Sequence, residues 1–396
     1  MHNEMDSKKI LYVNKQYRTY DYLKYMTITD KYELTVIWIC PFDKKDPIPT
    51  AAKKKLKFVI LGFVGNRLQP WHLSCSFKLF RLVLKYGKNI DLIISSTSDA
   101  WHSKVVFLAS RILKKPIAFR KEIWFRNKSF LRNLYYSMTV FIEKHANAVF
   151  YPGIRQKEFL LSYHVSSDKL LPFPYLIKEP SKRKIDVSLI NNIREELKDK
   201  IVFLYLGRII YRKGLDLLIE SFSRLEKFYR NVWLLIVGGP FSSKYKREHS
   251  ENYYEYCKDL AEERSKNISF LGEVAPSLVQ NYYYTADVFT HPHRKYLSKN
   301  RIIGEGWGNV VIEAASMRLP CILTDRISSA FELVENYKNG IIVDSDDIIN
   351  NLYNAMKFFI NNRDKINSFG EHSRYMYEKY NDPLKIINSI NSIFKK

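Results

Sequence analysis

The stretch that decides the fold is residues 201–225, which read IVFLYLGRIIYRKGLDLLIESFSRL. Ile201–Leu206 is a continuous apolar run of strand length, and from Leu215 onward the apolar side chains recur at helical spacing. Residues 207–214 connect the two segments. A strand, a short connection and a helix in direct succession form the repeating unit of parallel α/β domains.

The same alternation of strand-like and helix-like segments continues along the chain. The strands that we expect are 10–13, 34–39, 57–61, 91–95, 116–119 and 148–151 in the first half, and 201–206, 233–237, 268–271, 288–290, 320–324 and 340–343 in the second. The clearest helices of the first half are 76–86, 103–113 and 129–144. The pattern predicts an α/β protein with parallel sheets.

The length of the chain predicts two domains, because 396 residues exceed what one hydrophobic core usually serves. Three prolines between residues 172 and 180 precede a polar, charge-rich run, so we place the boundary near residues 178–200. The predicted domains are residues 1–180 and 181–378. Apolar residues at helical spacing predict one more helix within residues 379–396.

The positive charge is concentrated in the first half. The formal net charge is +23, and residues 51–150 alone contain 19 Lys and Arg against 4 Asp and Glu. A field of this sign attracts polyanions, such as nucleic acid, anionic lipid headgroups or a phosphorylated acceptor. The alternative is a generally Lys-rich composition that only keeps the protein soluble.

The cysteines and the apolar runs indicate the cellular compartment of the protein. The four cysteines are scattered, without metal-ligand spacing, which is typical of a reducing compartment. No secretory signal precedes the first expected strand, and apolar stretches such as 34–40 are too short to cross a bilayer. We therefore expect a cytoplasmic protein that is peripheral on the inner face of the membrane.

The most informative motif for chemistry is EGWGNVVIEAA at 305–315. With Asn309 near the N-cap, Glu313 is predicted to lie about one turn into a helix and to point back toward its N-terminus, where an anionic or hydroxyl-rich ligand is favoured. Since Glu313 stands among apolar residues, its carboxylate needs a partner. Ligand hydroxyls would supply one; an internal ion pair is the alternative.

Two further segments follow strands of the second half. Arg212 and Lys213 stand just before a helix, where cations oppose the helix dipole unless a phosphate binds there. The alternative is that both side chains extend into water. Gly238 and Gly239 follow the strand at 233–237, where glycines let a nucleotide approach the backbone. His291 and His293 lack a third ligand at usable spacing, so we interpret them as cleft-lining or structural and expect no metal.

Together these segments resemble glycosyltransferase family 4, the large group of retaining GT-B enzymes. The shared segments are, in order, LGR (206–208) with KG (213–214), VGG (237–239), ISFLGEV (268–274), ADVFTHP (286–292), EGWG (305–308) with EA (313–314), LP (319–320) with TD (324–325), and ELV (332–334) with NG (339–340). The resemblance covers residues 200–345 well. It implies two Rossmann-like domains facing a central cleft, with the C-terminal helix crossing back to the first domain.

The resemblance also implies roles for individual residues of a hexosyltransferase-type enzyme. Arg208 and Lys213 are expected to bind the diphosphate of a nucleotide-sugar donor, and Glu305 to face the donor sugar. Glu313 is expected to bind the ribose. The residues expected to line the rest of the donor site are Gly238, Val274, Gly308, Asn309 and Val310. No cofactor or metal is expected, because basic side chains and the helix dipole stabilise the leaving diphosphate.

The N-terminal half departs from the family pattern. No glycine-rich loop follows the first expected strand, and Glu122 is the candidate for a catalytic acid after the strand at 116–119. Residues 77–88 and 124–144 mix aromatic with basic side chains, which suits an anionic membrane surface. We expect a glycan or a lipid-linked sugar as acceptor and no nucleic acid. The alternative is that these are ordinary amphipathic helices packed on the sheet.

Three other functions stay open from the sequence. A GT-B sugar-nucleotide epimerase would act on the sugar without an acceptor. A nucleic-acid-binding protein would use the basic half, although it would leave the Glu305 and Glu313 pair unexplained. A degenerate transferase would serve only as a subunit of a larger enzyme.

Overall fold

The computed structural model describes residues 7–15, 21–40, 49–62, 72–125, 130–178, 185–240, 250–275, 277–297 and 302–395. The chain divides into two compact units. The N-terminal unit contains residues 1–177 and 381–396, and the C-terminal unit contains residues 178–380. Each unit is built around one parallel sheet.

The sheet of the N-terminal unit has the strand order β3-β2-β1-β4-β5-β6-β7, and all its neighbouring strands pair in parallel. Its strands are β1 (Lys9–Asn14), β2 (Glu33–Trp38), β3 (Lys57–Ile60), β4 (Leu92–Ser95), β5 (Ile117–Arg120), β6 (Ala148–Tyr151) and β7 (Leu170–Pro172). Apart from the added edge strand, this is the order of a doubly wound Rossmann sheet.

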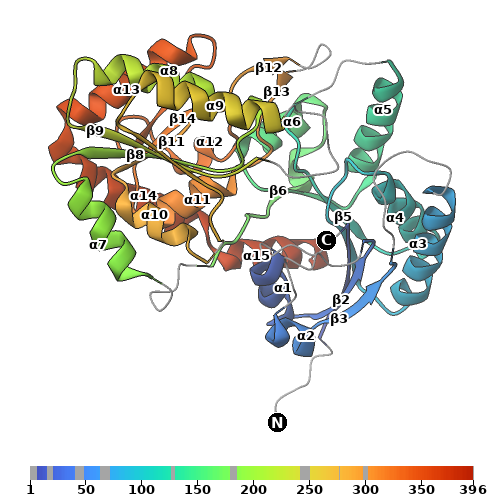
Figure 1. The fold of residues 1–396 in the computed structure, drawn as a ribbon. Helices are drawn as coiled ribbons and strands as arrows, with labels where there is room; N and C mark the ends of the chain where they lie inside the picture. The colour runs from blue at the N-terminus through green and yellow to red at the C-terminus, as the bar shows by residue number, and fades with distance from the viewer. Residues whose placement is uncertain are drawn as a thin grey trace. The chain divides into compact units, whose positions relative to one another are not determined.

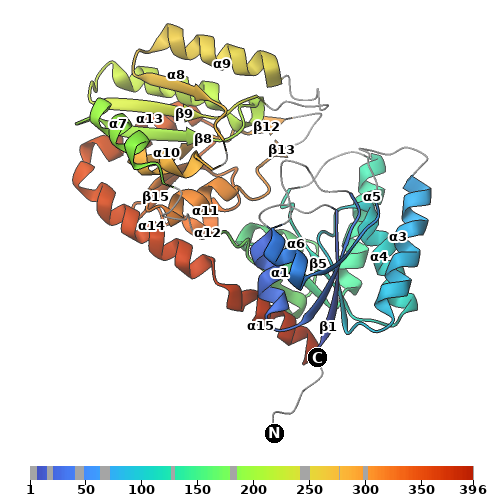
Figure 2. The ribbon, with the colours of Figure 1, turned by 60° about the horizontal axis from the view of Figure 1, so that its bottom comes forward.

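Helices cover both faces of this sheet because its central strands are apolar on both sides. Along β1, Ile10 and Tyr12 face one core while Leu11 and Val13 face the other. Figures 1 and 2 show α3, α4 and α5 side by side on one face, with α1 and α15 on the other. The helices are α1 (Asp21–Thr29), α2 (Thr50–Lys55), α3 (His72–Gly87), α4 (Trp101–Ile112), α5 (Phe130–His145), α6 (Ile154–Ser162) and α15 (Pro383–Phe394).

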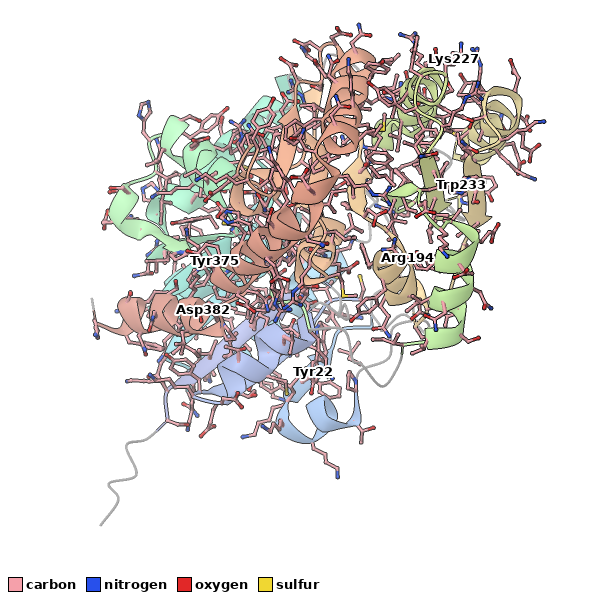
Figure 3. The ribbon with its side chains drawn as sticks, turned by 90° about the vertical axis from the view of Figure 1, so that its left-hand side faces the viewer. Tyr22, Arg194, Lys227, Trp233, Tyr375 and Asp382 are labelled. Atoms are coloured by element: carbon pink, nitrogen blue, oxygen red, sulfur yellow. The ribbon has the colours of Figure 1, made fainter. Side chains whose placement is uncertain are left out.

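The C-terminal helix α15 is an integral part of the N-terminal unit. Asp382, labelled in Figure 3, caps it by accepting a hydrogen bond from the Leu384 N–H at 2.9 Å. Ile386 and Ile390 are fully buried in the same core as α1 and β1. The last helix therefore completes a core that begins with the first strand.

The sheet of the C-terminal unit has the order β10-β9-β8-β11-β14-β15, again all parallel. Its strands are β8 (Ile201–Leu206), β9 (Val232–Val237), β10 (Ile268–Gly272), β11 (Val288–His291), β14 (Cys321–Thr324) and β15 (Gly340–Val343). The helices are α7 (Val187–Glu196), α8 (Leu215–Glu226), α9 (Ser250–Arg264), α10 (Val279–Thr285), α11 (Asn309–Ser316), α12 (Ala330–Leu333), α13 (Ile348–Asn361) and α14 (Ile366–Tyr380).

All twelve strands expected from the sequence are present, with ends that differ by no more than two residues. The sequence did not predict β7, which pairs only with β6 and ends at Pro172, as proline at a sheet edge allows. It also missed the hairpin of β12 (Tyr296–Leu297) and β13 (Ile302–Ile303). The charge-rich run after residue 180 contains α7, which carries Arg194 (labelled in Figure 3). Arg194 forms a salt bridge with Asp287 at 3.1 Å. Within the described residues, none of the helices combines the length and apolarity needed to cross a bilayer.

Candidate donor site of the C-terminal unit

The site begins where β8 ends. In both sheets the strand order reverses beside the first strand, and open α/β sheets bind ligands at this switch point, outside the carboxyl ends of the strands. In the C-terminal unit the switch point lies between β8 and β11. After β8 the chain forms a 3-10 turn, Tyr211–Lys213, and then enters α8.

Gly214 makes this sharp connection possible. Its φ is +70°, and a Cβ atom there would lie 2.2 Å from the carbonyl oxygen of Pro292. Both the left-handed backbone and the close approach require glycine. The tight packing holds Arg212 and Lys213 against the segment that follows β11, as the hydrogen bond from the Arg294 N–H to the Arg212 carbonyl at 3.1 Å also shows.

Glu305 forms salt bridges with both of these cations. Its Oε2 accepts hydrogen bonds from Arg212 Nη1 at 2.7 Å and from Lys213 Nζ at 2.5 Å. The three side chains are largely buried, with exposed fractions of 19% for Glu305, 15% for Arg212 and 8% for Lys213. The alternative that both cations extend into water is therefore wrong. The sequence analysis places Arg212 at the turn but does not assign it to the donor site. Its pairing with Glu305 makes it a further residue of the candidate site.

The electrostatics of the cluster keep Glu305 ionised. Burial by itself would raise the pKa of Glu305, but the charges of Lys213 and Arg212 outweigh it and hold the pKa well below its usual range. Burial, with smaller effects from the charges of Arg212 and Arg208, lowers the pKa of Lys213 even though Glu305 opposes the shift. Arg208 itself is exposed and lies near enough to act on Lys213.

Two neutral histidines complete the cluster. His293 Nε2 accepts a hydrogen bond from Arg212 Nη1 at 2.9 Å, and Lys213 Nζ lies 3.4 Å from His291 Nε2. Burial and the neighbouring cations lower the pKa of His293 to about 3 and that of His291 well below 6.5. The sequence interpretation of both as structural fits these contacts, but it did not anticipate that His293 would position Arg212.

The glycines after β9 bring three strand ends together. Gly238 has a φ of +151°, and a Cβ on it would lie 1.8 Å from the Gly207 carbonyl oxygen. The Gly238 N–H donates to the Gly272 carbonyl at 2.8 Å, and the Gly207 N–H to the Val237 carbonyl at 3.0 Å. The ends of β8, β9 and β10 therefore meet at Gly238. Val274, half-buried, follows two residues beyond Gly272.

The N-terminus of α11 lies next to Glu305. The helix begins at Asn309 and its N-cap is Gly308, so Asn309 lies next to the cap, as predicted. Gly308 has a φ of +98° and no side chain with which to cap the helix. A Cβ there would come within 3.7 Å of Glu305 Cγ and within 2.9 Å of Ile327, so the N-terminal turn with Asn309 and Val310 approaches Glu305 closely.

Glu313 has a partner inside the protein. It lies in the second turn of α11, as expected, and its Oε2 accepts a hydrogen bond from the Tyr283 hydroxyl at 2.9 Å. Tyr283 is buried on α10 and also reaches the Val310 carbonyl at 3.4 Å. The partner that the sequence analysis expected from ligand hydroxyls is therefore supplied in part by the protein itself. The sequence pattern could not predict this pair, because Tyr283 and Glu313 are 30 positions apart and lie on different helices.

Glu122 lies in the N-terminal unit, just beyond β5. Its Oε1 accepts a hydrogen bond from the Tyr175 hydroxyl at 2.9 Å, and Arg120 Nη1 lies 4.0 Å from the same atom. The side chain is half-exposed. Its place at the carboxyl edge of the sheet is the one expected of a ligand-facing carboxylate.

Metal ligands are not grouped in the described part of the chain: no three or more His, Cys, Asp or Glu side chains there are placed to hold an ion. The cluster at Glu305 consists instead of cations, one carboxylate and neutral imidazoles. Such a set recognises anions through charge-assisted hydrogen bonds.

Comparisons with known proteins point in the same direction. Residues 188–376, nearly the whole C-terminal unit, match the family model described as glycosyl transferases group 1. The chain is 29% identical over 173 residues to the lipopolysaccharide 1,2-N-acetylglucosaminetransferase of Salmonella typhimurium, which is 42% of each chain. It is 30% identical over 162 residues to the capsular polysaccharide biosynthesis glycosyltransferase CapM of Staphylococcus aureus, 40% of this chain and 37% of the relative.

These matches span about two fifths of the curated relatives' length. The similarity in fold extends further. The crystal structure of Anabaena Alr3699/HepE in complex with UDP and glucose superposes with a TM-score of 0.72, covering 98% of this chain and 100% of that one at 16% identity. The chain therefore has the GT-B fold, built from two sheets of parallel strands.

Proposed function

We propose that this chain is a retaining glycosyltransferase of family 4 that moves a sugar from a nucleotide-diphosphate donor to a glycan or lipid-linked acceptor at the cytoplasmic face of a membrane. The observation that carries the proposal is the convergence of Arg212, Lys213 and Glu305 at the switch point of the C-terminal sheet. Two matched relatives are named as a lipopolysaccharide N-acetylglucosaminetransferase and a capsular polysaccharide biosynthesis glycosyltransferase. These names support sugar transfer as the reaction.

The charge of the cluster suits a diphosphate. Arg208, Arg212 and Lys213 carry three positive charges against the single negative charge of Glu305, which leaves a net charge of +2 with both histidines neutral. Arginine matches phosphate oxygens in a bidentate manner, while lysine acts as a point charge. The N-terminus of α11 adds a positive dipole end beside Glu305.

The same groups would assist the chemical step. When the bond between the anomeric carbon and the diphosphate oxygen breaks, negative charge develops on the departing phosphate. Cations already held in place by Glu305 and His293 stabilise that charge without reorganising. The acceptor hydroxyl oxygen then forms the new bond to the anomeric carbon and passes its proton to the departing diphosphate. We therefore expect turnover without a metal ion.

Other residues would orient the donor. Glu305 would face the donor sugar, and Glu313, oriented by Tyr283, would bind the ribose. Gly238, where the ends of β8, β9 and β10 meet, would lie at the phosphates, and Val274 would border the base. In the N-terminal unit, Glu122 would act on the acceptor side.

The test is turnover of a panel of nucleotide-diphosphate sugars by the purified chain with a membrane extract as acceptor source. Release of nucleoside diphosphate together with labelled product is expected, with and without a metal chelator. Lys213→Met should abolish turnover, while the exposed Lys227→Met on the same unit should not. Lys227 is labelled in Figure 3.

Three outcomes contradict parts of this proposal. Conversion of the donor to an epimer without acceptor would favour the epimerase, and a product with inverted anomeric configuration would exclude retention. No turnover of any donor, together with unchanged thermal stability in the presence of every nucleoside diphosphate, would leave an inactive subunit.

A further inference from the structure

The outer face of the α3, α4 and α5 layer in the N-terminal unit carries large apolar side chains in water. Five of them are between 49% and 62% exposed: Phe77 on α3, Leu108 and Ile112 on α4, and Met138 and Phe141 on α5. Figures 1 and 2 show the three helices side by side on one face of the sheet. Large apolar side chains that gather on one exposed face of a protein indicate an interaction site.

Contacts between α4 and α5 hold these side chains in a fixed array. Lys104 Nζ donates to Thr139 Oγ1 at 2.7 Å, and the rings of Phe107 and Phe141 lie 6.2 Å apart. One turn further, Arg111 donates to the His145 carbonyl. The two helices therefore run parallel and in register, which keeps the exposed apolar residues on one common surface.

The charges on this surface have a single sign. The exposed cations are Lys78, Arg81 and Lys85 on α3, Arg111 on α4 and Lys144 on α5. Neither α3 nor α4 contains an acidic residue, and the acid of α5, Glu143, is buried in a salt bridge with Lys121 at 3.0 Å. The cations of α3 stay near aromatic rings, with Arg81 5.8 Å from the ring centre of Phe77.

We propose that this face of α3, α4 and α5 docks on an anionic lipid bilayer, with Leu108, Ile112, Met138 and Phe141 entering the headgroup region. Apolar side chains that enter the interface, surrounded by Lys and Arg, are the two contributions that bind peripheral proteins to anionic membranes. Single-stranded nucleic acid would use the cations and the rings, but it leaves the aliphatic side chains without a role. The inference rests on the proposed function in one respect, that a lipid-linked acceptor is met at a membrane.

The test is sedimentation of the full chain with vesicles of phosphatidylcholine alone and of phosphatidylcholine with phosphatidylglycerol. We expect binding to the anionic vesicles that weakens as salt rises. The double variant Leu108→Gln with Ile112→Gln should weaken it by at least about tenfold. Lys78→Gln with Lys85→Gln should weaken it about fivefold per cation.

Leu384→Gln is the matched control. Leu384 is 63% exposed on α15, on the other side of the same sheet, and glutamine suits a helix as well as leucine does. This variant should bind vesicles like the parent. Circular dichroism of each variant separates lost binding from lost folding.

Several results would overturn the inference. These are equal binding to neutral and anionic vesicles, an unchanged affinity of the Leu108 and Ile112 double variant, or salt-sensitive binding to a single-stranded oligonucleotide with none to vesicles. Donor hydrolysis measured without vesicles tests the proposed transferase separately. If vesicle binding fails while donor hydrolysis continues, only the proposal of a docking face is refuted.

Discussion

Replacing Glu305 by glutamine is the most direct test of the cluster. Glu305→Gln keeps the shape of the side chain but removes the charge that neutralises Arg212 and Lys213. Removing one partner of a buried ion pair costs about 3–5 kcal/mol, because the remaining charge stays buried. All three side chains keep between 8% and 19% of their surface in water, so we expect the lower end, about 3 kcal/mol.

The loss should be visible in thermal unfolding of the C-terminal unit, which spans residues 178–380. For a domain of this size, 1 kcal/mol corresponds to about 2–4 °C, so the midpoint should fall by about 6–12 °C. The control is Glu371→Gln, whose carboxylate pairs with Arg318 at 2.9 Å on the exposed surface. Exposed pairs contribute little, so its midpoint should hardly move.

A nucleoside diphosphate should reverse part of the effect. Its phosphates replace the missing negative charge, so the ligand should raise the midpoint of Glu305→Gln more than that of the parent. Turnover should still be lost, since Glu305 is assigned to the donor sugar. A variant midpoint within about 1 °C of the parent would refute the account of Glu305 as the group that holds the cations. A smaller ligand-induced shift in the variant would refute the assignment of the cluster to a diphosphate.

Three further predictions concern the residues around the cluster. Gly238→Ala should prevent stable folding of the C-terminal unit or abolish donor binding, because its Cβ would lie 1.8 Å from the Gly207 carbonyl; unchanged melting and binding would contradict this. His293, whose pKa is about 3, stays neutral while the unfolded chain takes up a proton, so stability should fall as the pH drops from about 6.5 toward 3, by up to about 1.4 kcal/mol per pH unit. His293→Gln should reduce that slope in urea unfolding, and an equal slope would exclude the effect. Glu313→Ala should abolish donor binding in calorimetry and Tyr283→Phe should weaken it several-fold, whereas equal affinities would remove both roles.

The sequence alone predicted most of the strands and several residues of the candidate donor site. Continuous apolar runs and helical periodicity placed the twelve expected strands, because each pattern reflects burial that is decided within a few residues. The roles of Lys213 and Glu305 were predicted from the resemblance to glycosyltransferase family 4, whereas the position before a helix drew attention to Arg212 and Lys213 equally. The edge strand β7 was not predicted, because it is three residues long, is only partly buried and contains a proline.

Only the tertiary structure decided which side chains meet. Arg212 and Glu305 are 93 residues apart, and their contact depends on β8 lying next to β11 in the sheet. The same strand order places His293 on Arg212, and the packing of α10 on α11 places Tyr283 on Glu313. Likewise, residues 101–112 could be recognised as a helix, but not which of its apolar residues stay in water. Local periodicity indicates whether a side chain is buried. Which residue packs against that side chain depends on the order of strands that are distant in the sequence, and no short stretch of sequence contains that order.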